Sequence, residues 1–393
     1  MKSYYRLGFI FLSLTALLFS CGVKETDSDF NHEMIIYPDG TSERSKNNIF
    51  TVTIKNGMEV SILSAEWMSY YEDRGDYTSI KSYYTPGRET TTPRNPVLRW
   101  DIAEECSNFT VLLSKNKNMG DAASFEVTSK SCELTNLFAG TKYYYQIQAH
   151  FEDYIVVSRR YNFKTTDFFR VVKIDGVYNV RDIGNKKTKN GKKRVKQGLV
   201  YRTANFDSVT ALGKTQAAEL GIKTDLDLRE PGPTESPLGE SVNYVNNGVG
   251  EYGSPLYYSI LNGVNVAMYQ PPMRDNLRMF ANANNFPLAF HCAVGRDRTG
   301  TLAITLYLLL GIKEEQIKQD YAVSYFSKAC NETDFEAYNE QMKTLFTYFS
   351  HYRGCDDKDN GNIYQRAEEY CLDIGLSKQE ITSIRENLLE PIK

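Results

Sequence analysis

The stretch that decides the fold is a ten-residue turn between two apolar runs. It reads His291-Cys292-Ala293-Val294-Gly295-Arg296-Asp297-Arg298-Thr299-Gly300. Residues 288–290 before it are all apolar, which is typical of a buried strand, and residues 299–310 after it are almost wholly apolar, which predicts a helix. Because a membrane-spanning helix needs about 20 apolar residues, this helix is expected to lie in a protein core.

Each residue type in this turn has a chemical use. Backbone N–H groups at a helix N-terminus, together with the helix dipole, form a nest for an anion such as a phosphoryl group. The same field favours the thiolate form of Cys292, which is a nucleophile. Gly295 permits a tight backbone path, and the planar Arg298 side chain matches two phosphoryl oxygens. The expected phosphate-binding residues of the turn are Ala293, Val294, Gly295, Arg296, Asp297 and Arg298.

Two neighbouring side chains complete the expected site. The Thr299 hydroxyl can donate to the sulfur of Cys292 and help it to leave in a second step, and His291 can orient the loop around the thiolate. The alternative is a buried cysteine beside an unrelated turn. It requires the strand, the Gly, the Arg-Thr-Gly run and the apolar helix to fall in register by chance.

The turn resembles the phosphate loop of the Cys-based protein-tyrosine phosphatases. From about Lys173 to Leu389 the chain is similar to the bacterial tyrosine phosphatase family that includes the secreted mycobacterial phosphatase and the Listeria lipid phosphatases. The resemblance implies a cysteinyl-phosphate mechanism without metal and a phosphate-binding role for Arg181. One departure is Arg296, where the family usually has Lys. The other segments that carry the likeness are Asn179-Val180-Arg181-Asp182-Ile183-Gly184, Gly198–Arg202, Asp227-Leu228-Arg229-Glu230, Asp320-Tyr321-x-x-Ser324 and Leu372–Leu389.

The general acid has two candidates. Most members of the wider superfamily use an Asp on a movable loop upstream of the nucleophile, yet no Asp lies between Asp227 and Asp275. Asp297 is adjacent to Arg298, and the resemblance implies a catalytic role for this loop Asp. Asp227 follows a predicted strand, and pairing with Arg229 or capping of the backbone would also explain it. Proximity to the phosphate favours Asp297.

The rest of the C-terminal part predicts an α/β domain over residues 167–393 with a central, mostly parallel sheet. Strand-like and helix-like segments alternate, which is the order of parallel βαβ units. Everything after residue 312 reads as helix. The expected strands are 199–202, 223–228, 242–246 and 288–291, and the expected helices before residue 312 are 210–220, most of 265–284, and 299–310.

Residues 48–166 predict an all-β sandwich, because short β-rich runs alternate with turn residues. The segment Leu134-x-x-Leu137-x-x-Gly140-Thr141-x-Tyr143 resembles the tyrosine corner of fibronectin type III domains, with a core at about 93–166. Trp100 would fill that core. The expected strands are 49–55, 97–100, 109–114, 125–129, 142–149 and 156–165.

The N-terminus predicts export. Lys2 and Arg6 precede an apolar run over residues 7–19, so residues 1–20 read as a signal peptide. The following Cys21 sits in a lipobox-like context, which predicts a lipid anchor, a solvated tether over 21–47 and a periplasmic, outer-membrane or surface lipoprotein of the cell envelope. The alternative is a signal peptide that is cleaved nearby without lipidation.

Export also affects how the other cysteines are interpreted. In an oxidising compartment Cys106 with Cys132, and Cys355 with Cys371, are plausible disulfides, which would leave Cys330 and Cys292 unpaired. Buried free thiols are the alternative for each pair.

The composition of the chain argues against two classes of protein, dedicated nucleic-acid binders and zinc proteins. The chain has 393 residues, enough for two or three domains, and a formal net charge of -3, which argues against a dedicated nucleic-acid binder. Four His and no Cys-x-x-Cys pair leave few zinc ligands. We expect no nucleic-acid partner, no metal and no cofactor.

The predicted function is an exported phosphatase that hydrolyses phosphotyrosine. A phosphoinositide or inositol polyphosphate phosphatase is the alternative, because such substrates favour basic residues near the mouth of the site and Arg296 supports this. A non-enzymatic alternative is an adhesion-type lipoprotein with a relic phosphatase fold. A basic run could steer anionic substrates or membranes, although such runs are more often solvated turns. It comprises Lys186, Lys187, Lys189, Lys192, Lys193, Arg194 and Lys196.

Overall fold

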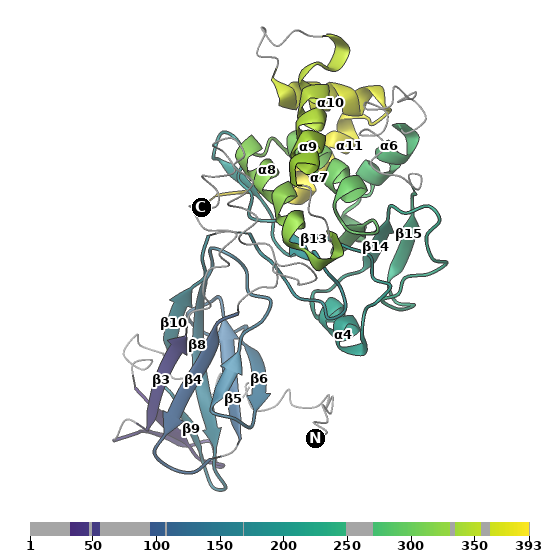
Figure 1. Cartoon of the computed structure of the whole chain (residues 1–393). Helices are drawn as coiled ribbons and strands as arrows, with labels where there is room; N and C mark the ends of the chain where they lie inside the picture. The colour runs from purple at the N-terminus through teal and green to yellow at the C-terminus, as the bar shows by residue number, and fades with distance from the viewer. Residues whose placement is uncertain are drawn as a thin grey trace. The chain divides into compact units, whose positions relative to one another are not determined.

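The computed structural model describes residues 32–46, 49–55, 95–106, 108–167, 169–248, 270–330, 335–354 and 362–392. The described residues form two compact units. Unit 1 contains the strands up to Lys164, and unit 2 contains the remaining strands and the long helices (Figure 1). The predicted signal peptide, Cys21 and Cys355 lie outside the described residues.

Unit 1 is built from two antiparallel sheets. The larger has the order β2-β1-β9-β8-β5-β6, with β10 also paired to β8, and the smaller has the order β3-β4-β7. The predicted strand 156–165 is divided between β9 and β10. The strands are β1 Met34–Ile36, β2 Ser42–Arg44, β3 Phe50–Lys55, β4 Val97–Ile102, β5 Phe109–Ser114, β6 Ala123–Val127, β7 Ser131–Glu133, β8 Lys142–His150, β9 Ile155–Val157 and β10 Tyr161–Lys164.

The core of unit 1 follows the two-residue period of its strands. On β8 every second residue from Tyr143 to Ala149 is buried, because successive side chains of a strand point to opposite faces. Trp100 of β4 meets Phe109 of β5 edge to face, with ring centroids 5.3 Å apart. Trp100 is 4% exposed, which fits the expected core position.

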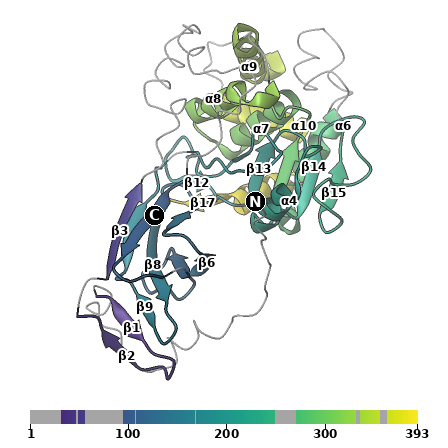
Figure 2. The same ribbon diagram turned by 60° about the horizontal axis from the view of Figure 1, so that its bottom comes forward.

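Two expectations for unit 1 need correction. Residues 34–36, expected in a solvated tether, form β1, which pairs with β9 and with β2 (Figure 2). The polar, acidic composition of the residues before position 30 favoured a tether, but the short apolar run Met-Ile-Ile that follows pairs with β9 and extends the sheet. Cys106 and Cys132 are both free thiols, so the plausible disulfide between them is not formed.

Unit 2 contains a five-stranded sheet of order β11-β13-β16-β14-β15. The last four strands are parallel to one another, and β11 is antiparallel to β13, so the sheet is mostly parallel as predicted. These strands are β11 Arg181–Asp182, β13 Val200–Thr203, β14 Thr224–Asp227, β15 Asn243–Asn246 and β16 Leu288–His291.

Helices cover both faces of this sheet. Leu288 and Phe290 of β16 belong to one apolar core, which includes most of α7, whereas Ala289 belongs to a second core with Ala217 of α4. Accordingly, α4 and α7 lie on opposite sides of the sheet (Figures 1 and 2). The helices are α4 Ala211–Glu219, α6 Gln270–Arg278, α7 Asp297–Leu310, α8 Glu314–Val323, α9 Phe335–Ser350, α10 Ile363–Asp373 and α11 Lys378–Leu388, with 3-10 turns η4 Ala283–Asn285, η5 Ser324–Phe326, η6 Lys328–Cys330 and η7 Tyr352–Gly354.

The apolar run after the turn forms the buried helix α7. All of its residues from Arg298 to Leu310 are buried, and it ends at Gly311, whose left-handed φ of 72° suits glycine. Thr210 caps α4 by accepting a hydrogen bond from the Gly213 backbone.

The chain after residue 312 is not helical to its end. Residues Leu389–Pro391 form strand β17, which pairs antiparallel with β12, Lys193–Val195 (Figure 2). This pairing joins segments nearly 200 residues apart, which local periodicity does not encode.

No helix within the described ranges combines the length and apolar character needed to cross a membrane.

Candidate active site

The Cys292 loop, residues 292–298, begins at the carboxyl end of β16. This strand is central in the sheet, with β13 on one side and β14 on the other, both parallel to it. Ligands of open α/β sheets bind at the carboxyl ends of such strands. Gly295 has a φ of 73°, and a Cβ there would lie 2.2 Å from the carbonyl oxygen of Thr203, so the loop's path requires glycine.

Three successive carbonyl groups of the loop accept hydrogen bonds from residues outside it. The C=O and N–H of a peptide unit point in opposite directions, so these bonds turn the following N–H groups toward the inside of the loop. The result is a nest of donors suited to an anion. The donors are Asn205 to Ala293 at 2.8 and 3.1 Å, Asn179 to Val294 at 3.0 Å and to Gly295 at 3.2 Å, and Arg202 to Gly295 at 2.9 Å.

Cys292 is only 2% exposed at the centre of this arrangement. Burial and the Asp297 carboxylate raise the pKa of its thiol, but Thr299 and the Arg298 guanidinium outweigh them, and the pKa lies below its usual value. The Thr299 hydroxyl is buried and lies near enough to the sulfur to lower the pKa of the thiol. The thiol is therefore poised as a nucleophile.

Two charged residues of the loop, Asp297 and Arg298, act on the sulfur of Cys292, and a third, Arg296, is paired with Asp297. The Nη1 of Arg298 donates to the Leu228 carbonyl at 3.2 Å, which orients the guanidinium. The Nε and Nη2 of Arg296 donate to the two carboxylate oxygens of Asp297 at 2.9 and 3.0 Å. Asp297 keeps 22% of its side chain exposed, so it borders solvent at the mouth of the loop.

His291 is fully buried behind the nucleophile. Its Nδ1 lies 3.1 Å from the carbonyl oxygen of Cys292, and its Nε2 lies 2.9 Å from Oδ1 of Asp225. Burial lowers the pKa of His291, but Asp225 and Asp227 raise it more, and the pKa lies above its usual value. Both ring nitrogens of His291 therefore have a contact, as its expected role in orienting the loop requires.

The second acid candidate, Asp227, is buried and bound on several sides. It accepts from the Arg229 backbone at 2.9 Å, from the Arg229 guanidinium at 2.8 Å and from the Tyr244 hydroxyl at 3.1 Å. Burial raises its pKa, but Arg229 and His291 lower it, and the pKa lies below its usual value. Both structural explanations considered for Asp227, pairing with Arg229 and a backbone cap, are present.

The guanidinium of Arg181, for which the resemblance implies phosphate binding, is turned toward acceptors of the chain itself. Its guanidinium is 1% exposed and donates to Asp320, Asn179 and Ser324. Because these acceptors occupy its donors, Arg181 supports the loop from behind through Asn179 rather than lining the anion nest.

Asp320 is the centre of this support. Its carboxylate lies 2.6 Å from Arg202, 3.1 Å from Arg181 and 3.2 Å from Lys186, and all four side chains are fully buried. Burial raises the pKa of Asp320, but the three cations outweigh it and hold the pKa far below its usual range.

Residue-by-residue reasoning from the sequence assigned no role to Asn179, Arg202, Asn205, Asp225 or Asp320. Three of them lie in segments that carry the family resemblance, and that was the available signal. Asn205 and Asp225 lay outside those segments and could be found only from contacts.

Most residues of the basic run around Asn190 bind acidic side chains or carbonyl groups within unit 2. Lys186 binds Asp320, Lys187 binds Asp167, and Arg194 binds Glu390 of β17. Lys196 donates to the carbonyls of Glu386 and Asn387 at the end of α11. Most of these cations are therefore structural.

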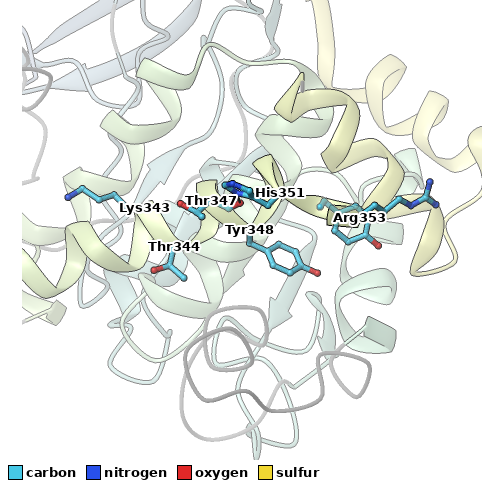
Figure 3. Close-up of a pocket in the computed structure, with 7 residues that line it drawn as sticks. Lys343, Thr344, Thr347, Tyr348, His351 and Arg353 are labelled. Carbon is cyan, nitrogen blue, oxygen red and sulfur yellow. Dashed lines mark hydrogen bonds between the residues drawn. The ribbon is translucent and has the colours of Figure 1, made fainter. Parts of the chain in front are cut away.

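A cavity is lined by residues 343–353, far from the Cys292 loop in the sequence. It has a volume of about 610 Å³, and its lining residues come from α9, η7 and His351 between them (Figure 3). Among the residues that the structure describes, no group of three or more His, Cys, Asp or Glu could hold a metal ion.

Comparison with known proteins relates residues 172–390, more than half of the chain, to the model of the tyrosine phosphatase family. A candidate tyrosine-protein phosphatase of Cupriavidus necator is 28% identical over 172 residues, which are 38% of this chain and 61% of that protein. A tyrosine-protein phosphatase of Nostoc commune is 25% identical over 214 residues, which are 48% of this chain and 73% of that protein. The chain thus spans less than two thirds of the length of the first relative.

Two solved structures are also similar. P. aeruginosa TpbA is 15% identical, covers 56% of this chain and 95% of its own, and has a TM-score of 0.26. The core catalytic domain of the PP-IP phosphatase SIW14 from S. cerevisiae is 19% identical, covers 38% and 91%, and has a TM-score of 0.25. Scores this low establish neither a common substrate nor a common mechanism.

Proposed function

Since the chain belongs to the tyrosine phosphatase family, we propose that its Cys292 loop hydrolyses phosphomonoesters, with phosphotyrosine as the main substrate. The observation that carries the proposal is the position of a buried, low-pKa thiol inside a loop whose carbonyls are held outward. The loop N–H groups and Arg298 then receive the three peripheral oxygens of a phosphoryl group.

The proposed reaction has two steps. The Sγ of Cys292 attacks phosphorus, the P–O bond to the leaving group breaks, and the leaving oxygen takes a proton from the general acid. A water molecule then attacks the cysteinyl-phosphate, the P–S bond breaks, and the proton of the water passes to the same carboxylate. Thr299, next to the sulfur, stabilises the departing thiolate. The net change converts a phosphomonoester and water into an alcohol and phosphate.

We assign the general acid to Asp297 rather than Asp227. Asp227 is fully buried and its carboxylate is occupied by Arg229 and Tyr244, whereas Asp297 borders solvent beside Arg298. Asp297 is bonded to Arg296 in the substrate-free loop, so the proposal requires Arg296 to turn to the phosphate when substrate binds.

The pairing of Arg296 with Asp297 also bears on the alternative substrates, phosphoinositides and inositol polyphosphates. The Arg296 side chain is only 10% exposed, and a guanidinium that leaves Asp297 for a further phosphate would favour a phosphoinositide or an inositol polyphosphate. Arg296→Lys separates the two classes. It should reduce kcat/KM on a polyphosphorylated inositol more than on a phosphotyrosine peptide if the second phosphate binds Arg296, and reduce both equally if it does not.

The experiment that tests the function is a substrate panel on the purified protein. We expect release of phosphate from phosphotyrosine peptides, a phosphate adduct on Cys292 after acid quench, and no change on addition of EDTA. Absence of turnover on every phosphomonoester in the panel would favour the relic alternative, an adhesion-type lipoprotein. Inhibition by EDTA that zinc reverses would count against the metal-free mechanism.

We further propose that unit 1 is fibronectin-III-like and that the protein is exported and anchored through Cys21. The grouping of β3, β4 and β7 in one sheet and of β5, β6 and β8 in the other supports the first part. The second part rests on the sequence of residues 1–21. Full-length protein should partition into detergent, and Cys21→Ala should not. Equal partitioning of the two would favour a plain signal peptide.

A further inference from the structure

Asp225 is a buried carboxylate beneath the nucleophile for which the proposed mechanism has no use. It lies on β14 two residues before Asp227, so both side chains point to the same face of the strand. Its Oδ1 lies 2.9 Å from Nε2 of His291, and its Oδ2 accepts from the hydroxyl of Ser236 at 2.6 Å. Asp225 itself is 0% exposed.

The hydrogen bonds of this cluster restrict where its protons lie. A carbonyl oxygen only accepts, so Nδ1 of His291 carries a proton toward Cys292. The Ser236 oxygen accepts from the Leu238 backbone at 3.2 Å, so its own proton points to Asp225. When Asp225 is ionised, its Oδ1 can only accept, so Nε2 of His291 carries a proton as well. Both ring nitrogens are then protonated, and the ring carries a positive charge.

Few other charged groups among the described residues face the His291 ring or the sulfur of Cys292. The second carboxylate facing the ring, Asp227, lies 3.7 Å from Nδ1 but is engaged by Arg229 and by Tyr244 of β15. On another side the ring of Phe206 meets the imidazole edge to face at 5.0 Å. Around Cys292 itself, the charged groups of α7 that face the sulfur are Asp297 and Arg298.

We propose that Asp225, fixed by Ser236, is a positioning residue that keeps His291 doubly protonated against the Cys292 carbonyl, so that the loop closes around a thiolate. The inference rests on the proposed function, because a thiolate is needed only if Cys292 is the nucleophile. The raised pKa of His291, to which Asp225 contributes most among the charged groups, agrees with this geometry.

The decisive variant is Asp225→Asn, which keeps the size of the side chain and removes its charge. The pH dependence of Cys292 alkylation by iodoacetamide, followed by mass spectrometry of the Cys292 peptide, reports the thiolate directly and needs no turnover. We expect the alkylation profile to move to higher pH by about one unit, which leaves about tenfold less thiolate below the midpoint. An unchanged profile in a folded Asp225→Asn protein would overturn the proposal.

Asp227→Asn is the matched control, because Asp227 is equally buried on the same strand face but shares its charge with Arg229. Its alkylation profile should move less than that of Asp225→Asn. Equal shifts would mean that any buried carboxylate in this strand suffices, and the specific role of Asp225 would be lost.

A second measurement uses the unaltered chain and remains decisive if Asp225→Asn does not fold. The chain has four His, so nitrogen NMR of the ¹⁵N-His-labelled full-length protein can resolve each ring, with His291→Asn for assignment. We expect both nitrogens of His291 to remain protonated at pH 7.5. A neutral ring at that pH would refute the proposal. If the ring is charged and the thiolate forms while no phosphomonoester is hydrolysed, the proposed function fails and the role of Asp225 stands.

Discussion

The core of unit 1 and the surroundings of the Cys292 loop bury opposite kinds of side chain. The sandwich packs aromatic and aliphatic residues such as Trp100, Phe109 and Ile147. The support behind the loop buries Arg181, Lys186 and Arg202 around the single carboxylate of Asp320.

The difference indicates what each region is built for. Burying charge costs several kcal/mol per ion before pairing, so replacing an ion cluster by apolar side chains is often neutral or stabilising. A stable core does not need such a cluster, and the sandwich has none of comparable size among the described residues. Guanidinium and carboxylate groups do provide directional hydrogen bonds, and the Arg202 guanidinium holds the carbonyl of Gly295 in place.

The largest expected effect comes from Cys292→Ser, which removes the reacting atom and leaves the buried charges untouched. Turnover of an aryl phosphate should be abolished while binding of a phosphate analogue and the melting temperature stay near those of the unaltered protein. Kinetics and calorimetry on the same preparation test this. Turnover close to the original value would remove Cys292 from the mechanism.

Asp320→Asn tests the support itself. It leaves Arg181, Lys186 and Arg202 without their shared carboxylate, and breaking a buried ion pair costs about 3–5 kcal/mol of unfolding free energy. We expect kcat/KM to fall as well, because Arg202 also holds the Gly295 carbonyl. Denaturant unfolding and aryl phosphate kinetics measure the two effects.

Leu98→Ala in the sandwich is the contrasting variant. Loss of this fully buried side chain should also cost about 2–5 kcal/mol but leave kcat/KM unchanged, because no catalytic group depends on it. Equal losses of kcat/KM in Leu98→Ala and Asp320→Asn would erase the distinction between the two regions.

The two acid candidates differ in the size of effect and in its dependence on the leaving group. For Asp297→Asn we expect a drop of about 10² in kcat on phosphotyrosine peptides and a smaller one on an activated nitrophenyl ester, which leaves without help. Asp227→Asn should lower both substrates by similar factors, because its bonds to Arg229 and Tyr244 hold the end of β14. The reverse pattern would transfer the acid role to Asp227.

The stability of unit 2 should fall in acid. Asp320 and Asp227 have folded-state pKa values below their unfolded value of about 3.9, so the unfolded chain binds more protons in that interval. Their contribution is present above about pH 4 and is lost as the pH falls toward the folded pKa values. Unfolding at a series of pH values from 2 to 6 should show a smaller slope for Asp320→Asn than for the unaltered protein. Equal slopes would contradict the prediction.

The smallest effect is expected at Asp101 of the sandwich. Its ion pair with Lys130 is exposed, with 78% of the Asp101 side chain accessible. Such pairs are screened by water and salt, so Asp101→Asn should leave the melting temperature unchanged within error. A clear drop in the melting temperature would mean that this exposed ion pair contributes to the stability of the sandwich.

The order of strand, loop and helix around Cys292 could be predicted from the sequence. These residues are neighbours in the chain, so the apolar run, the glycine and the helix N-terminus place Cys292, Arg298 and Thr299 close together. The mostly parallel sheet followed in the same way from alternating strand and helix patterns.

Which distant side chains meet depends on how the folded chain packs. Asp225 is 66 residues from His291, and Arg181 is 139 residues from Asp320. Their contacts depend on the register of β14 against β16 and on the packing of α8, neither of which leaves a periodic signal. The resemblance therefore assigned Arg181 to phosphate binding, although its guanidinium is paired with Asp320. The role of the basic run likewise depended on partners in β17 and α11 that lie far away in the sequence. A charged residue type shows that a partner is needed, but only the packed chain shows which one is near enough to bind.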